Sequence, residues 1–299
     1  MASWLNFFVG KTPRERLGTA MNYGLIATVV VLAMQIKWMS KSPNPAEWNY
    51  YSAEANDHLY SSTEAMAPMP MAVVAHRGGS VPDDAQAGPI RRLDYSYQNG
   101  HRLVELDFSW TSDNEIVVKH DWKSVKTVPT LDAYLAESPD EHASLQMIYA
   151  WMDQHPDVFV VTDCKKRSLE FFAKVRMERP GLVPRFIPQI YQMKDYELAK
   201  SQGYRHIVLT LYRCLADAPT DQVVDFAASH DLFALTVPLR RVQDSDIARR
   251  VRELGIPVYV HTINDVDQVP AVIAAGCSGV YSDTLHNEQL MRLAVRNSL

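Results

Sequence analysis

Residues 157–212 read DVFVVTDCKKRSLEFFAKVRMERPGLVPRFIPQIYQMKDYELAKSQGYRHIVLTLY. This stretch contains three short apolar runs of the kind that form buried strands, at 157–165, 185–191 and 205–212. Two segments between them, 169–178 and 193–203, space their apolar residues along one face of a helix. Short buried strands that alternate with amphipathic helices indicate parallel β–α–β units, so we expect an α/β fold.

The same alternation continues on both sides of this stretch. Further predicted strands lie at 71–76, 102–109, 115–120, 232–238, 256–262 and 278–283. Further helical patterns lie at 221–231, 244–255 and 265–276. About eight such units in about 230 residues predict a (β/α)8 TIM barrel, with either 115–120 or 278–283 as an accessory strand. A doubly wound open sheet is the alternative, but its nucleotide-binding GxGxxG motif does not follow the first strand.

The composition is that of a globular protein. Of 299 residues, 47% are hydrophobic and 22% are charged, which excludes a wholly disordered chain. Thirty basic residues against 35 acidic ones give a net charge of −5, so we expect no general attraction to nucleic acid. The three cysteines form no CxxC or zinc-binding pattern, and we expect them to be buried free thiols. The oligomeric state is not indicated.

The amino-terminal part differs from the rest of the chain. Residues 17–36 carry no charge, and a helix of that length would span about 30 Å, the hydrocarbon thickness of a bilayer. We therefore predict a tail and membrane-anchoring helix at 1–40, a proline-rich linker at 41–70 and the barrel at 71–299. A small excess of basic residues before the apolar run places the barrel on the extracytoplasmic side. A cleaved signal peptide and an amphipathic or partner-binding helix are the alternatives.

Carboxylates follow the predicted strands toward their carboxyl ends. Glu105 and Asp107 are two residues apart, so both point to the same face of the second strand, and Asp163 ends a later strand. Carboxylates among apolar neighbours are costly unless a cation neutralises them. Three carboxylates form a suitable oxygen cage for Mg²⁺ or Ca²⁺, so the sequence predicts a divalent-cation site made of these residues.

Other polar residues also stand where strands end. His76-Arg77 ends the first strand, His120-Asp121 the third, and Lys165 follows Asp163. Each of these alone is compatible with a structural role. In a parallel barrel, however, the carboxyl ends of successive strands meet at one mouth, where catalytic groups are found. We therefore expect these side chains to converge.

Three segments carry a resemblance to a known family. AHRGG (75–79), GHRLVELDFSWTSDNEIVVKHD (100–121) and GIPVYVHTINDVDQVPAVIAAGCSGVYSD (255–283) resemble the glycerophosphodiester phosphodiesterases, relatives of phosphatidylinositol-specific phospholipase C. The resemblance covers residues 71 to 285. The spacing of the HRG motif and the ExD…HD block is the most specific part of it.

The resemblance implies a role for each matching position. The two catalytic histidines match His76 and His120. The metal ligands match Glu105, Asp107 and Asp163, and the phosphate-contacting groups match Arg77 and Lys165. The implied metal is a divalent cation, Mg²⁺ or Ca²⁺. The implied chemistry is hydrolysis of a phosphodiester, with one histidine accepting a proton and the other donating one.

The sequence departs from the family pattern at four places. Asp163 replaces a glutamate, and Pro82-Asp83-Asp84-Ala85 replaces the family's P-E-N-T segment. Asn114 replaces a turn glycine, which asparagine can do because it tolerates a left-handed backbone. His261 replaces a tryptophan, either filling space or offering a hydrogen-bond donor to a substrate headgroup.

The predicted function is therefore a metal-dependent phosphodiesterase. An anchor beside such a site favours a glycerophosphodiester or lysophospholipid as substrate. Two alternatives remain: a phospholipase C-like lyase that produces a cyclic phosphate, and a catalytically eroded membrane-tethered binding module. The two histidines argue against the binding module, because binding alone requires no acid–base pair.

Overall fold

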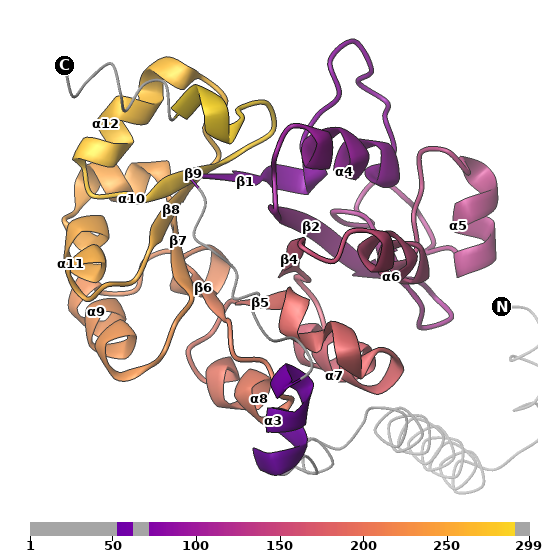
Figure 1. Ribbon diagram of the computed structural model, residues 1–299, viewed down its shortest axis with the longest axis horizontal. Helices are drawn as coiled ribbons and strands as arrows, with labels where there is room; N and C mark the ends of the chain where they lie inside the picture. Colours follow the sequence, from indigo (N-terminus) through magenta and orange to yellow (C-terminus); the bar gives the residue numbers. More distant parts are fainter. Residues whose placement is uncertain (1–52, 62–71, 291–299) are drawn as a thin grey trace, which may run out of the picture. The chain divides into compact units, whose positions relative to one another are not determined.

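The computed structural model describes residues 53–61 and 72–290. In the described part, parallel strands form a ring with helices around its outside (Figure 1). The strands of the ring are β1 (Val73–Ala75), β2 (Leu103–Trp110), β4 (Phe159–Asp163), β5 (Phe186–Ile190), β6 (Val208–Thr210), β7 (Ala234–Pro238), β8 (Val258–His261) and β9 (Gly279–Ser282). This is the predicted TIM barrel.

Hydrogen bonding between the first and last strands closes the ring. The strands pair in the order β1-β9-β8-β7-β6-β5-β4-β2, and β1 also pairs with β2 through Ala75 and Val104. All eight of these strands are parallel to their neighbours in the ring. A doubly wound open sheet, the alternative considered from the sequence, is thereby excluded.

The remaining strand, β3 (Ile116–Val118), lies outside the ring. It pairs antiparallel with the end of β2, where Phe108 faces Val118. The predicted strand at 115–120 is therefore the accessory one, and 278–283 contains the eighth barrel strand. Asn114, in the connecting turn, has φ of 64°, the left-handed conformation expected for a residue in place of glycine.

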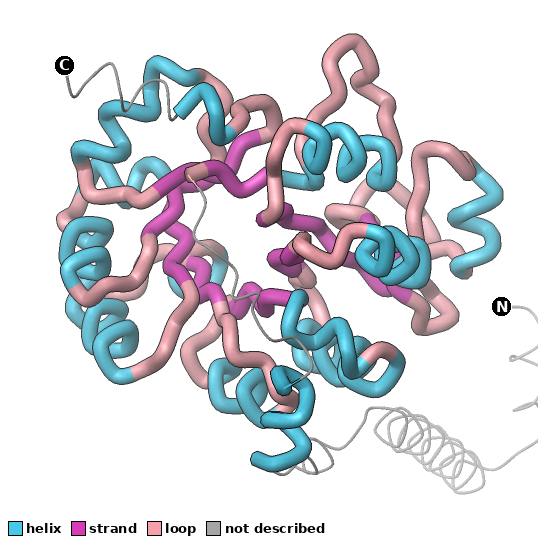
Figure 2. The backbone as a smooth tube through the Cα atoms, in the orientation of Figure 1, coloured by secondary structure: helices cyan, strands magenta, loops and turns pink. Residues whose placement is uncertain are grey.

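The helices lie on the outer surface of the ring (Figure 2). The predicted patterns correspond to α7 (Ser168–Glu178), α8 (Asp195–Ser201), α9 (Thr220–Ser229), α11 (Ile247–Glu253) and α12 (Val269–Ala274). Five further helices were not predicted from the sequence: α3 (Ala53–Ser61), α4 (Pro89–Gln98), α5 (Leu131–Glu137), α6 (Leu145–Gln154) and α10 (Leu239–Asp244). Short 3₁₀ turns complete the connections, at η2 (His76–Gly78), η3 (Pro180–Arg185), η4 (Arg213–Leu215) and η5 (Val266–Gln268).

The barrel interior changes character along its axis. Its lower part is apolar and contains Val74, Leu103, Phe159, Val161, Ile187, Val208, Ala234, Tyr259 and Tyr281. The same strand faces continue upward with polar residues, as in Leu103, Glu105 and Asp107 of β2. A larger apolar layer packs between the strands and the helices. The polar upper part of the interior is therefore supported from below and from outside by a close-packed core.

Helix α3 packs at the opposite end of the barrel from the polar groups. Asn56 donates to the carbonyl of Ser201 at 3.5 Å, and the Tyr60 hydroxyl donates to that of Gly203 at 3.1 Å. Arg205 stacks on the Tyr60 ring at 4.0 Å. Because residues 201–206 lie just before β6, this contact is at the amino-terminal end of the strands. The adjoining η3 turn, just before β5, also contacts α3.

The predicted anchoring helix at 17–36 lies outside the described residues, as does most of the predicted linker. Within the described ranges, no helix has both the length and the apolar character needed to cross a bilayer. The three cysteines are free thiols. Cys164 and Cys277 are buried as expected, but the expectation was wrong for Cys214, which is exposed within the 3₁₀ turn after β6.

Candidate active site

A cavity of about 190 Å³ opens at the carboxyl-terminal ends of the barrel strands. We call it the inner cavity. Its wall contains residues from β1 to β8 or from the turns that directly follow them: His76, Arg77, Asp107, His120, Asp163, Lys165, Gln189, Tyr191, Thr210, Tyr212, Arg213, Thr236 and His261. Seven of the eight residues that the sequence predicted for the site line this one cavity. The eighth, Glu105, is buried beside them with 2% of its side chain exposed.

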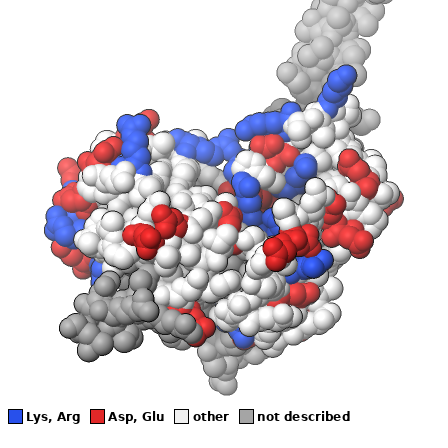
Figure 3. All heavy atoms as spheres, turned by 90° about the horizontal axis from the view of Figure 1, so that it is seen from above, with Lys and Arg blue, Asp and Glu red and all other residues white. Residues whose placement is uncertain are grey.

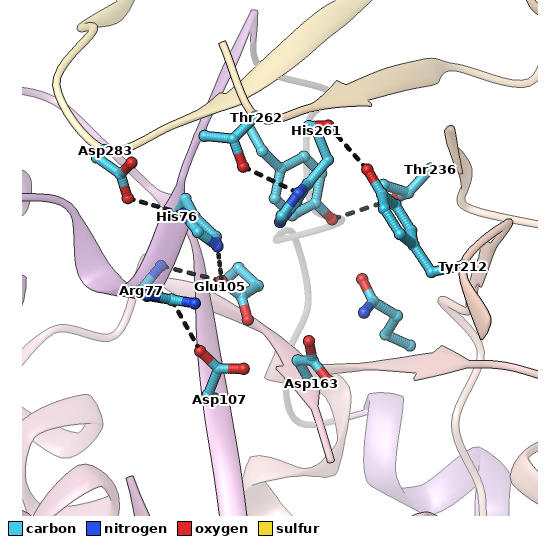
Figure 4. Close-up of polar contacts among 12 residues, drawn as sticks. His76, Arg77, Glu105, Asp107, Asp163, Tyr212, Thr236, His261, Thr262 and Asp283 are labelled. Atoms are coloured by element: carbon cyan, nitrogen blue, oxygen red, sulfur yellow. Dashed lines mark hydrogen bonds and ion pairs between the residues drawn. The ribbon is translucent and has the colours of Figure 1, made fainter. Parts of the chain in front are cut away.

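The three predicted metal ligands lie together. Glu105, Asp107 and Asp163 each offer one carboxylate oxygen, and these oxygens lie within 4.8 Å of one another. Figure 4 shows the three side chains pointing toward the same space. Strand register explains the arrangement, because Asp107 of β2 pairs directly with Asp163 of β4.

The cluster is electrostatically costly without a cation. Burial, together with the charges of Asp107 and Asp163, raises the pKa of Glu105 well above its usual range. Burial also raises the pKa of Asp163. Glu105 Oε2 accepts a hydrogen bond from the Arg77 backbone N–H at 2.9 Å, but its buried Oε1 has no hydrogen-bond partner. An unpartnered carboxylate oxygen beside two further carboxylates fits a divalent cation with oxygen ligands.

Two basic side chains neutralise part of this charge. Lys165 Nζ lies 2.5 Å from Asp107 Oδ1 and 2.7 Å from Asp163 Oδ2, so it bridges the two carboxylates. Although partial burial disfavours the ammonium, the two carboxylates raise the pKa of Lys165. Arg77 Nε lies 3.1 Å from Asp107 Oδ2, while nearly half of its side chain remains exposed at the mouth. Both cations can therefore contact an anion that enters the cavity.

His76 is held by an aspartate that the sequence analysis did not assign to the site. Its Nδ1 lies 2.7 Å from Asp283 Oδ1, and its Nε2 lies 3.8 Å from Glu105 Oε2. Burial favours the neutral form of Asp283, but hydrogen bonds from His76 and Asn264 lower its pKa to about 2. The ionised Asp283 thus orients the imidazole with Nε2 toward the acidic cluster (Figure 4).

Asp283 itself is fixed by neighbouring hydrogen bonds. Asn264 Nδ2 donates to Asp283 Oδ2 at 2.7 Å, and the Asp283 N–H donates to Asn264 Oδ1 at 2.8 Å. Asp283 directly follows β9, so the reasoning that singled out the other strand ends could have found it.

His120 is the more exposed of the two predicted catalytic histidines. It follows β3, and its Nδ1 lies 3.0 Å from Asp121 Oδ2, with 43% of the side chain exposed. Its ring lines the inner cavity together with His76. The antiparallel pairing of β3 with β2 brings it there, because Lys119 N–H donates to the carbonyl of Asp107 at 3.0 Å. The accessory strand therefore carries a histidine to the mouth.

Apart from Arg213, in the turn after β6, the opposite wall of the inner cavity is neutral. The His261 ring lies edge-on to the His76 ring, with centroids 4.4 Å apart. Burial, together with the charge of His76, lowers the pKa of His261 to about 3, so this imidazole is neutral at physiological pH. The Tyr212 hydroxyl donates to the His261 carbonyl at 2.8 Å, which leaves the ring of Tyr212 as part of the wall. Thr210 and Thr236 line the same side.

Gln189, near the end of β5, and Tyr191, directly after it, lie between the two walls. The Tyr191 hydroxyl donates to Asp163 Oδ1 and accepts a hydrogen bond from Gln189 Nε2 at 3.3 Å. Asp163 is thus held by Lys165 and Tyr191 together. Its shorter side chain, where the family has a glutamate, still reaches the cluster.

The segment that replaces P-E-N-T contributes no carboxylate to the acidic cluster. Asp84 pairs instead with Arg91 at 2.7 Å, and Ala85 lines a second, outer cavity. The cluster therefore consists of Glu105, Asp107 and Asp163 among the described residues.

No protein-family model matches this sequence, and no curated protein matches it either. Solved structures do resemble the fold. A glycerophosphodiester phosphodiesterase from Thermotoga maritima superimposes with a TM-score of 0.58 at 18% identity, covering 76% of this chain and 100% of that chain. A second from Parabacteroides distasonis gives a TM-score of 0.60 at 17% identity, covering 77% of this chain and 100% of that one.

A third structure includes a reaction product. It is an Oleispira antarctica phosphodiesterase in complex with the product sn-glycerol-3-phosphate, with a TM-score of 0.54 at 17% identity, covering 76% of this chain and 97% of that chain. Identities this low establish the fold and leave the activity open. The likeness supports the resemblance that the three sequence segments predicted.

Proposed function

We propose that this protein is a metal-dependent phosphodiesterase that hydrolyses a glycerophosphodiester or lysophospholipid-type substrate. The carrying observation is that His76, His120, Arg77 and Lys165 line one cavity with the carboxylates of Asp107 and Asp163. An acid–base pair, two phosphate-binding cations and an acidic cluster are the groups that this hydrolysis requires. The structural likeness to glycerophosphodiester phosphodiesterases supports the same reaction.

Glu105, Asp107 and Asp163 would hold the divalent cation, Mg²⁺ or Ca²⁺. When bound, this cation supplies positive charge that stabilises the negative charge developing on the phosphoryl oxygens. Arg77 and Lys165 bind the phosphodiester beside it and offset the same charge. The low-dielectric walls of the cavity strengthen both interactions.

The two histidines perform the proton transfers. One imidazole accepts a proton from water as the water oxygen forms a bond to phosphorus. The other imidazolium donates a proton to the ester oxygen as its bond to phosphorus breaks. The products are a free alcohol and a phosphate monoester, and one proton moves back between the histidines through solvent to restore the starting state.

The membrane location is part of the proposal and rests on sequence alone. The uncharged residues 17–36 would anchor the chain, with the catalytic domain on the extracytoplasmic side. Such an anchor would bring the barrel to lysophospholipid substrates.

The test is hydrolysis of glycerophosphodiesters and lysophospholipids by the full chain, with and without a chelator. We expect turnover that chelation abolishes and that added Mg²⁺ or Ca²⁺ restores. His76→Ala and His120→Ala should each lower kcat by about 10²–10⁴-fold. Lys126→Gln, a change at an exposed lysine outside both cavities, serves as the matched control.

Other outcomes would identify the alternatives. Formation of a cyclic phosphate that persists in chelator would identify a lyase. Metal-replete protein that turns over no diester would indicate a binding module and would overturn the proposal.

A further inference from the structure

A second cavity of about 430 Å³ adjoins the inner cavity. We call it the outer cavity. The two share Arg77, Asp107 and His120. The rest of its wall comes from the segment before α4, from α4 itself, from the end of β3 and the residue after it, and from α5 and the loop after it, and includes Arg92, Lys119, Tyr134, Glu141 and His142.

The shared residues determine how a diester would occupy the two cavities. Arg77 and His120 are a phosphate-binding group and a proton-transfer group of the proposed reaction. A phosphodiester carries two organic substituents on one phosphorus. With the phosphoryl group at the shared residues, one substituent would lie in the inner cavity and the other in the outer cavity. The volume of the outer cavity lies within the range of small-molecule sites.

The wall of the outer cavity has an excess of positive charge. Arg92 and Lys119 line it, and neither forms an ion pair with a carboxylate of the described residues. Arg92 Nε donates to the carbonyl of Ala87 at 2.6 Å, which orients the guanidinium and leaves its terminal nitrogens available. Two acidic residues line the outer cavity. Asp107 is already paired with Arg77 and Lys165, and Glu141 is exposed on the rim.

Two further features favour an anion here. Helix α4 begins at Pro89 in the wall, with the positive end of its dipole toward the cavity. His142 lies stacked on Tyr134, with ring centroids 3.8 Å apart, so this face of the tyrosine is closed to a quaternary ammonium group. Lys119 Nζ, 5.8 Å from the centroid of the same ring, would repel such a cation.

We propose that the outer cavity binds a substrate arm that carries its own negative charge, such as a phosphorylated polyol, and discriminates against a quaternary ammonium arm. Arg92 and Lys119 contact the additional anion. This selectivity rests on the proposed phosphodiesterase function and narrows its substrate class. Arginine and lysine side chains that form no ion pair with a carboxylate of the described residues suit a phosphate monoester, since each can form a charge-assisted hydrogen bond with it.

The experiment compares three diesters of glycerol 3-phosphate on the full chain: with inositol 4-phosphate, with inositol and with choline. We expect kcat/KM to be highest for the phosphorylated arm and lowest for choline. The double variant Arg92→Gln/Lys119→Gln should lower the preference for inositol 4-phosphate over inositol by about tenfold or more. Lys126→Gln removes an exposed lysine of the same loop and should leave this preference unchanged.

Direct binding separates this inference from the function on which it rests. The probes are inositol 1,4-bisphosphate and inositol, titrated calorimetrically into the wild type and the variants. Failure to hydrolyse any of the diesters would overturn the phosphodiesterase function. Even then, a tenfold weaker affinity of the double variant for inositol 1,4-bisphosphate would support the anion subsite. Equal kcat/KM for all three arms, or bisphosphate affinity unchanged in the double variant, would overturn the subsite.

Discussion

The two sides of the barrel mouth differ in charge although they are built from equivalent positions on parallel strands. On the side of β1, β2 and β4, the inward positions carry His76, Glu105, Asp107 and Asp163. On the side of β6, β7 and β8, the corresponding residues are Thr210, Thr236 and His261, which are neutral, whereas Arg213 lies in the 3₁₀ turn after β6. One fold thus presents a charged wall suited to chemistry and a neutral wall suited to shape recognition.

The surface outside the mouth has no comparable division in the view of Figure 3. Basic and acidic side chains are interspersed over that face. The separation of charge at the mouth is therefore not continued on that face. Variants of the two walls should accordingly differ in kind as well as in magnitude.

The largest difference in effect between the two walls should appear when one polar side chain of each wall is replaced. Glu105→Gln should weaken metal binding about 100-fold and lower kcat about 10³-fold, because it removes a charged ligand from a buried cluster. Isothermal titration with Mg²⁺ and Ca²⁺ measures the binding. The matched change on the neutral wall, Thr236→Val, should leave metal affinity within about twofold of wild type.

A second readout for Glu105→Gln does not depend on activity. Because burial and like charges raise the pKa of Glu105, the neutral glutamine should raise the Tm of the metal-free protein. A lower Tm, with metal binding intact, would contradict the assignment of this cluster as a cation site.

An intermediate effect is expected for the residue that orients His76. Asp283→Asn should lower kcat about tenfold with little change in KM, because the imidazole loses the carboxylate at 2.7 Å that holds it. A kcat equal to that of wild type, or a loss confined to KM, would reduce Asp283 to a structural role. Asp265→Asn, at an exposed aspartate after β8 that lines neither cavity, is the control.

The smallest effect is expected on the neutral wall. His261→Phe should change KM about two- to fivefold and leave kcat nearly as it is. The reason is that the neutral imidazole, packed edge-on to His76, forms part of the cavity wall and transfers no proton. Steady-state kinetics at several pH values tests this. If kcat fell 100-fold, His261 would belong with the proton-transfer groups and the comparison between the walls would fail.

The fold could be predicted from the sequence because the spacing of apolar residues along the chain reflects which faces of each strand and helix are buried. Strands buried on both faces are continuous apolar runs, and the outer helices have one apolar face. Helices α4 to α6 were not singled out; they surround the hairpin of β2 and β3, where the simple alternation of strand and helix is interrupted. The sequence also could not decide between 115–120 and 278–283 as the accessory strand, because both are short apolar runs.

The site was predictable to the extent that strand alternation determines direction. Glu105 and Asp107 could be assigned to one face of β2, and the strand-end rule placed His76 and Asp163 near them. The same rule could have singled out Asp283 at the end of β9, but neither its contact with His76 nor the outer cavity could be derived in this way. The His76–Asp283 contact joins residues 207 positions apart, and the outer cavity depends on how the loops before α4 and after α5 fold back over β3.

The contact between α3 and the base of the barrel has a practical consequence. A surface linker attached just ahead of Ala53 would hold the barrel at its closed end. A substrate arriving from the bulk phase would then meet the open end without the linker in its path. Immobilisation through the amino-terminal side should therefore preserve access for soluble diesters, whereas a graft on the turn between β2 and β3 would place the attachment near the entrance.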